Sequence, residues 1–157
     1  MEPKIGITPE HRSATAQKLN KVLADEFILY TKTRKAHWNV EGPDFHAQHL
    51  FFESQYEQLD ETMDEVAERI RMLGHYAPGT LAEFLKLTQL SEKLREGNDS
   101  LGFIRELLID HESIIINLRA DVNLFANEYK DMGTSDFLTA LMETHEKMAW
   151  MLRAHLR

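Results

Sequence analysis

Glycine and proline are few in this chain and they are bunched, and this constrains the fold more than any other feature. The 157 residues contain seven Gly and four Pro. In the long stretches between these clusters, apolar residues recur every three or four positions, which is helical spacing, and strand-like alternation is not evident. A composition of 43% hydrophobic and 28% charged residues is typical of a folded globular protein. We therefore expect an all-α protein built from long helices.

Capping signals and breakers predict where these helices begin and end. Thr8-Pro9-Glu10 supplies an N-cap, a first-turn proline and an acid that the helix dipole favours. Gly42-Pro43 and Pro78-Gly79 break the pattern, and Gly74 suits a C-terminal cap. The predicted helices cover residues 9–38, 45–73, 81–85, 101–129 and 135–157.

The connections predict how the helices are arranged. The links between the first two long helices and between the last two are short, whereas residues 75–98 form a long central connection that contains the short helix. Two antiparallel hairpins joined by such a crossover make a four-helix bundle. The length suits one domain, so we expect a single domain over residues 1–157 with a short N-terminal tail at 1–8.

Composition also limits the function. The chain has no Cys, which leaves His and carboxylates as its strong metal ligands. It shows no signal-peptide pattern and no apolar stretch of bilayer length, so we expect a cytoplasmic protein with no membrane partner. A net charge of −8 repels phosphate backbones, and nucleic acid is therefore not the favoured partner.

One face of the second predicted helix carries candidate metal ligands. At 100° per residue, His49, Glu53, Asp64 and Glu68 fall within about 100° of arc. However, His49 and Asp64 lie fifteen residues apart, which is about 22 Å along a helix. One ion cannot reach both, so each chain would supply two half-sites.

These four positions are symmetric about the point between residues 58 and 59. A two-fold antiparallel crossing there would set His49 opposite Glu68, and Glu53 opposite Asp64, of a second copy. Tyr56, Leu59 and Met63 would then pack at the interface. A long acidic helix offers many symmetric pairs, so a solvated acidic face is the alternative interpretation. The chain has no Glu-x-x-His motif, the usual ligand pair of iron sites inside a bundle.

Further motifs surround the stripe in a specific order. They are His37-Trp38-Asn39, the turn Gly42-Pro43-Asp44-Phe45, His49 twelve residues after His37, and the run Asp64-Glu65-Val66-Ala67-Glu68-Arg69. With these motifs the chain resembles the Dps family, the mini-ferritins named DNA-binding proteins from starved cells. The resemblance covers nearly the whole chain except the N-terminal tail, and it implies a ferritin-like four-helix bundle with a short extra helix in the central crossover.

The resemblance also implies a function and a site. The family's ferroxidase centre falls on His37, His49 and Glu53 of one subunit and on Asp64 and Glu68 of its two-fold mate. The family often has Asp where Glu53 stands. His37, His49, Asp64 and Glu68 are the expected catalytic residues. The expected reaction is oxidation of Fe(II) to Fe(III), preferably by hydrogen peroxide, with ferric mineral stored in a hollow homododecamer built from two-fold dimers.

Several assignments remain open at this stage. Some family members compact nucleoid DNA through Lys-rich tails, but this tail is poor in Lys, so a DNA-compacting protein without significant ferroxidase activity is the second interpretation. A non-catalytic scaffold is the third. A DNA-compacting protein, the second interpretation, would be associated with the nucleoid. Glu128, Asp131 and Asp136 are candidates for an acidic iron-entry pore, with helix capping as an equal alternative. His111 and His145 lie on apolar stripes and are expected to be hydrogen-bonded core residues.

Overall fold

The computed structural model describes residues 2–93 and 95–157, and these residues form five α-helices without a β-strand. The helices are α1 (Pro9–Asn39), α2 (Phe45–Met72), α3 (Leu81–Leu87), α4 (Ser100–Asn127) and α5 (Met132–Ala154). The all-α prediction is confirmed. An isolated parallel bridge between Glu41 and Asp99 ties the α1–α2 loop to the start of α4.

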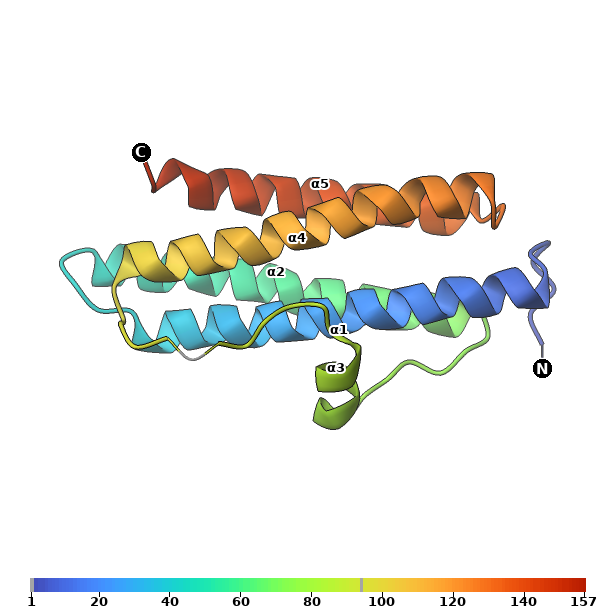
Figure 1. Ribbon diagram of the computed structural model, residues 1–157, viewed down its shortest axis with the longest axis horizontal. Coiled ribbons are helices and arrows are strands. Elements are labelled where there is room, and N and C mark those ends of the chain that lie inside the picture. The colour runs from blue at the N-terminus through green and yellow to red at the C-terminus, as the bar shows by residue number, and fades with distance from the viewer. Residues whose placement is uncertain (1, 94) are drawn as a thin grey trace.

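The four long helices form two hairpins that lie side by side (Figure 1). One hairpin is α1 with α2, and the other is α4 with α5. Residues 73–93 and 95–99 lie in the crossover between them, which carries α3, and α3 packs against α1. The predicted crossover is therefore present. The α1–α2 loop lies at one end of the bundle.

Side chains that accept backbone hydrogen bonds fix the helix starts. Thr8 caps α1 by accepting from His11 N at 3.2 Å, and Asp99 caps α4 by accepting from Gly102 N at 2.7 Å. The start of α5 differs from the prediction. Asp131 accepts from Thr134 N at 2.9 Å, so the residues expected to form a loop up to Thr134 are the first turn of α5.

The core consists of the apolar stripes of the long helices. Leu29, Leu59, Leu107 and Leu138 are fully buried, one on each long helix. Leu59 was expected at a subunit interface, but it lies in the core of its own chain. The stripe of α2 that includes Leu59 also includes Phe52 and Val66, and its burial turns the face with the candidate ligands outward.

The N-terminal segment is attached to the bundle. Arg12 is buried, and its guanidinium donates to the carbonyl oxygens of Pro3 at 3.0 Å and Ile7 at 3.1 Å and pairs with Glu2 at 2.6 Å. Pro3 packs on Gly74 so closely that a Cβ at Gly74 would lie 2.7 Å from its ring. Within residues 2–93 and 95–157, no helix combines the length and the apolar character needed to cross a membrane.

Candidate metal centre

Two histidines meet where α1 ends and α2 begins. The Nδ1 of His37 donates to the carbonyl oxygen of His49 at 2.9 Å, and the Nδ1 of His49 donates to the carbonyl oxygen of His37, also at 2.9 Å. Their rings stack with centroids 3.7 Å apart. A carbonyl only accepts, so each Nδ1 carries the hydrogen and each neutral ring keeps a lone pair on Nε2. The pair therefore offers two metal-ligating nitrogens.

The loop between the helices makes this contact. It reverses the chain through Gly42, whose φ of +130° is strained for any residue with a side chain. Val40 is buried and closes α1 by donating from its N–H to the Ala36 carbonyl at 2.9 Å. Glu41 N–H donates to the Asn98 carbonyl at 2.9 Å. These contacts fix the part of the connection that follows His37.

Glu53 lies one turn beyond His49 and is linked to the pair by Tyr56. The Tyr56 hydroxyl donates to Glu53 Oε1 at 3.3 Å, and its ring stands edge-on to the His37 ring at 5.2 Å. Burial, and then the charge of Glu53, raise the pKa of Tyr56, so the phenol keeps its proton and remains a donor. We call His37, His49 and Glu53 the His half-site.

Arg34 provides a cation behind the His half-site. Its guanidinium lies 5.5 Å from the Tyr30 ring centroid, 5.1 Å from that of Trp38 and 4.8 Å from that of Tyr56. It also donates to the Tyr30 hydroxyl at 2.6 Å. This hydrogen bond is the main cause of a raised pKa at Arg34, which therefore stays charged. The four side chains form one stacked wall.

Asp64 and Glu68 lie toward the other end of α2, and both are exposed. We call them the acid half-site. Asp64 borders an open depression of about 500 Å³ whose lining includes Phe27, Met63 and Phe84. One chain does not join the two half-sites, because His49 and Asp64 lie fifteen residues apart on the single continuous helix α2, a distance of about 22 Å. In the described residues, 2–93 and 95–157, no group of three or more His or acidic side chains is placed to hold a metal ion.

The other acidic candidates differ in their surroundings. Asp131 is buried, caps α5, accepts from the Thr134 hydroxyl at 2.6 Å and pairs with Arg69 at 3.1 Å. These contacts show that Asp131 caps α5, which is the alternative that the sequence left open for this residue. Glu128 and Asp136 are exposed, and the pore remains a prediction for them.

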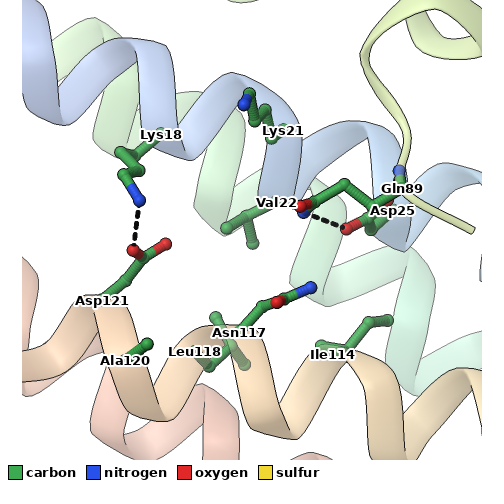
Figure 2. A pocket seen from close by; sticks show the side chains of 10 residues that line it. All are labelled: Lys18, Lys21, Val22, Asp25, Gln89, Ile114, Asn117, Leu118, Ala120 and Asp121. Carbon is green, nitrogen blue, oxygen red and sulfur yellow. Dashed lines mark hydrogen bonds and ion pairs between the residues drawn. The ribbon is translucent and has the colours of Figure 1, made fainter.

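A separate hollow of about 130 Å³ lies between α1 and α4 (Figure 2). Lys18 and Asp121 pair across it at 2.7 Å. Asp25 accepts from the backbone N–H and the side-chain amide of Gln89 at 2.7 and 3.2 Å and from Thr88 at 2.7 Å. The residues that line this hollow include no histidine, so the hollow is not the candidate metal centre.

Sequence reasoning missed the roles of three residues, two beside the His half-site and one in the core. Tyr56 was expected only to pack at an interface, and Arg34 was not singled out, although Tyr56 lies three residues after Glu53 and Arg34 four before Trp38, which are contact spacings on a helix. Glu26 was also missed. It contacts His145, which lies 119 residues away, and local sequence patterns carry no signal for such a pair.

Comparisons with known proteins agree with this architecture. Residues 16–157 match the model of the ferritin-like domain. A low-temperature-induced protein of Nostoc sp. is 45% identical over 152 residues, which are 97% of this chain and 85% of that protein. DNA protection during starvation protein 2 of Bacillus anthracis is 36% identical over 138 residues, which are 88% of this chain and 93% of that protein.

Solved structures agree as well. DpsC from Streptomyces coelicolor superposes with a TM-score of 0.95 at 31% identity and covers 100% of this chain and 91% of its own. The Dps protein from Vibrio cholerae, described as a member of a broad superfamily of ferritin-like diiron-carboxylate proteins, superposes with a TM-score of 0.93 at 30% identity and covers 99% and 97%. The chain therefore belongs to the Dps family of ferritin-like proteins.

Proposed function

We propose that this protein is an iron-detoxifying mini-ferritin that oxidises Fe(II) at sites shared between two subunits. Each site combines the His half-site of one subunit with the acid half-site of its two-fold mate. The observation that carries the proposal is the reciprocal hydrogen bonding of His37 and His49, which leaves the Nε2 atom of each ring available as a ligand. Membership of the Dps family supports the same function.

The donor set suits ferrous iron as a substrate. Imidazole nitrogens bind Fe(II), and carboxylates also stabilise the ferric product. Because each Nδ1 donates to a backbone carbonyl, these contacts orient the two rings and leave the Nε2 atom of each ring to bind the cation. Tyr56 donates a hydrogen bond to Glu53 and stands edge-on to the His37 ring, so it connects the carboxylate with the pair. The chain thus prepares one half of the coordination sphere before iron arrives.

The proposed reaction balances with hydrogen peroxide as the oxidant. Two Fe(II) ions each give one electron, the O–O bond of peroxide breaks, and two protons complete two water molecules. The ferric ions then hydrolyse to an oxyhydroxide mineral and release protons. Because both electrons reach one peroxide molecule, no hydroxyl radical is formed. Removal of Fe(II) and peroxide together would protect DNA, which is the role that the name of the Bacillus anthracis relative states.

The mineral requires an enclosed space, so we propose a hollow assembly of twelve chains built from two-fold dimers. The open depression beside Asp64 supports a second copy at this position, since its lining is apolar at Phe27, Met63 and Phe84 and acidic at its edge. A copy that covers this depression would bring its own His half-site close to Asp64.

Iron oxidation by variants tests the proposal. Fe(II) and peroxide are mixed with the wild-type protein, with His37→Ala and with Asp64→Ala, and the ferric absorbance is followed. Both variants should lose most of the initial rate, because each removes one ligand from every site. Glu65→Ala is the matched control, since Glu65 is an exposed acid of the same helix that lies outside the stripe, and it should oxidise iron normally. Equal rates in all four proteins would refute the ferroxidase.

A further inference from the structure

The apolar core contains one chain of hydrogen-bonded ionisable groups. Glu26 of α1, His145 of α5 and His111 of α4 are each fully buried. Glu26 Oε1 lies 2.8 Å from His145 Nε2, and the Nδ1 atoms of His145 and His111 lie 2.9 Å apart. None of the three belongs to the proposed iron site. Buried polar groups of this kind are costly and call for a physical explanation.

The partners determine where the hydrogens lie. With Glu26 ionised, the carboxylate accepts, so His145 carries its hydrogen on Nε2. A neutral His145 then has a lone pair on Nδ1, and His111 must donate to it from its own Nδ1. This leaves a lone pair on His111 Nε2, for which the described residues provide no partner. Both ring hydrogens in these hydrogen bonds therefore point toward Glu26, and the His111 Nε2 atom has no partner among the described residues.

This arrangement resists an additional proton. A proton on His145 Nδ1 would place two N–H groups against each other at 2.9 Å. A proton on His111 Nε2 would create a buried cation with an unpaired N–H. Burial, and then the nearby His145, hold the pKa of His111 well below its ordinary value. The hydrogen-bonded arrangement therefore keeps His111 neutral under conditions in which an ordinary histidine becomes charged.

The surroundings offer little compensation for such a charge. The buried face of α2 contributes Gln48, Phe52, Gln55, Leu59, Thr62, Val66 and Ile70, none of which titrates in this range. On α4, the nearest acid is Asp110, but it pairs with Lys32 of α1 at 2.5 Å, and Lys32 also pairs with Glu106 at 3.2 Å. Among the described carboxylates, Glu26 is thus the one that hydrogen-bonds to His145, and His111 has no carboxylate partner.

The hydrogen bonds among Glu26, His145 and His111 also link the two hairpins. Glu26 lies on α1, and the two histidines lie on α4 and α5 (Figure 1). Other polar links between the hairpins are Lys18 with Asp121, Lys32 with Asp110 and Arg69 with Asp131. Those are pairs of a cation with a carboxylate, and the ordinary pKa values of such groups lie outside the range from about 5 to 8. The central link is the one that contains histidine.

We propose that Glu26, His145 and His111 form a proton-operated lock between the two hairpins. The lock is closed near neutral pH, when the three groups share two ring hydrogens directed toward the carboxylate. Below the ordinary titration range of histidine, uptake of a further proton breaks the His111–His145 contact, admits water to the core and loosens α4 and α5 from α1. Acidity would thereby open the subunit from its centre.

The sign of the effect follows from linkage. The unfolded chain binds a proton at His111 as the pH falls through about 6.5, whereas the folded chain does not. The stabilisation by the lock is therefore complete above that pH and is lost as the pH falls toward the lowered pKa of His111. For one unshared proton, the equilibrium constant for unfolding rises about tenfold for each pH unit below 6.5.

A histidine replacement tests the lock. His111→Gln keeps a side-chain N–H donor for His145 but does not titrate, and His46→Gln at an exposed position is the matched control. Urea unfolding is measured at one protomer concentration between pH 5.5 and 7.5. As the pH falls from 7.5 to 5.5, the ratio of the wild-type unfolding constant to that of His111→Gln should rise about tenfold. The ratio of the wild-type constant to that of His46→Gln should stay the same. Parallel curves for wild type and His111→Gln would overturn the proposal.

A second measurement on the wild-type protein does not depend on any variant. Hydrogen–deuterium exchange at the C2 position of each imidazole, read by mass spectrometry, reports the titration of individual histidines. His111 should show no titration midpoint near 6.5, the ordinary value for histidine. In the same samples, amides of α4 and α5 near His111 and His145 should exchange faster below about pH 6. An ordinary midpoint for His111 within an intact fold refutes the lock.

Discussion

Two variants that are each inactive should restore iron oxidation when they share a dimer. His37→Ala removes a ligand from the His half-site, and Asp64→Ala removes one from the acid half-site. Within one subunit the half-sites cannot substitute for each other, because His49 and Asp64 lie fifteen residues apart on the continuous helix α2, a distance of about 22 Å. Only a second chain can complete a site. A hybrid dimer would therefore contain one intact site and one site with both defects.

The expected recovery follows from random pairing. When equal amounts of the two variants are unfolded together and refolded, half of the two-fold dimers are hybrids, and half of the sites in each hybrid are intact. The initial rate of ferric absorbance, measured after mixing with Fe(II) and peroxide, should thus reach about one quarter of the wild-type rate. Each variant refolded alone should stay near the rate without protein.

A matched mixture separates shared sites from nonspecific rescue. His37→Ala and His49→Ala damage the same half-site, so every site in their hybrid dimers lacks one histidine. That mixture should show no recovery. If the first mixture is no faster than the mean of its two components, the sites are not shared between subunits, and the proposed pairing of half-sites is wrong.

Three further predictions concern stability and DNA. Leu59→Ala should lower the free energy of unfolding by about 2–5 kcal/mol, because Leu59 is fully buried; urea unfolding measures this loss, and a loss below about 1 kcal/mol would contradict the packing. Asp131→Ala should cost about 1–3 kcal/mol in the same assay, because it uncaps α5 and leaves Arg69 unpaired, whereas Asp136→Ala at an exposed position should change stability by less than about 0.5 kcal/mol. In a gel shift at about 0.15 M salt, the wild-type protein should leave duplex DNA free, because Arg12 holds the N-terminal segment and the net charge is −8; tight binding would favour the DNA-compacting alternative.

The sequence was most informative where the deciding interactions are local. Thr8 and Asp99 cap their helices through hydrogen bonds to residues three positions ahead, and such contacts can be recognised from residue type and spacing. At α5 the same reasoning placed the start of the helix too late: capping by Asp131 was one of two open alternatives, but residues up to Thr134 were expected to form a loop. The separation of His49 from Asp64 followed from helix geometry alone, and the structure has both residues on the continuous helix α2.

Tertiary contacts set the limit of prediction. The apolar stripes placed His111 and His145 in the core, as the structure confirms, but they gave no reason to connect either residue with Glu26. The link between Glu26 and His145 depends on how two hairpins pack after a long crossover. The wall around Arg34 also needs the angle between α1 and α2, which brings Tyr56 to a cation carried by the other helix.

The contacts between His37 and His49 also have a consequence for the order of events during refolding. They close a segment of only twelve residues, and loops of this length close within about 100 ns. The encounter of two subunits takes milliseconds to minutes and depends on concentration. Each half of the proposed site would thus be ready long before its counterpart arrives. After dilution from denaturant, helix content should return at a rate independent of protein concentration, and iron oxidation should return later, at a rate that increases with the number of chains in solution.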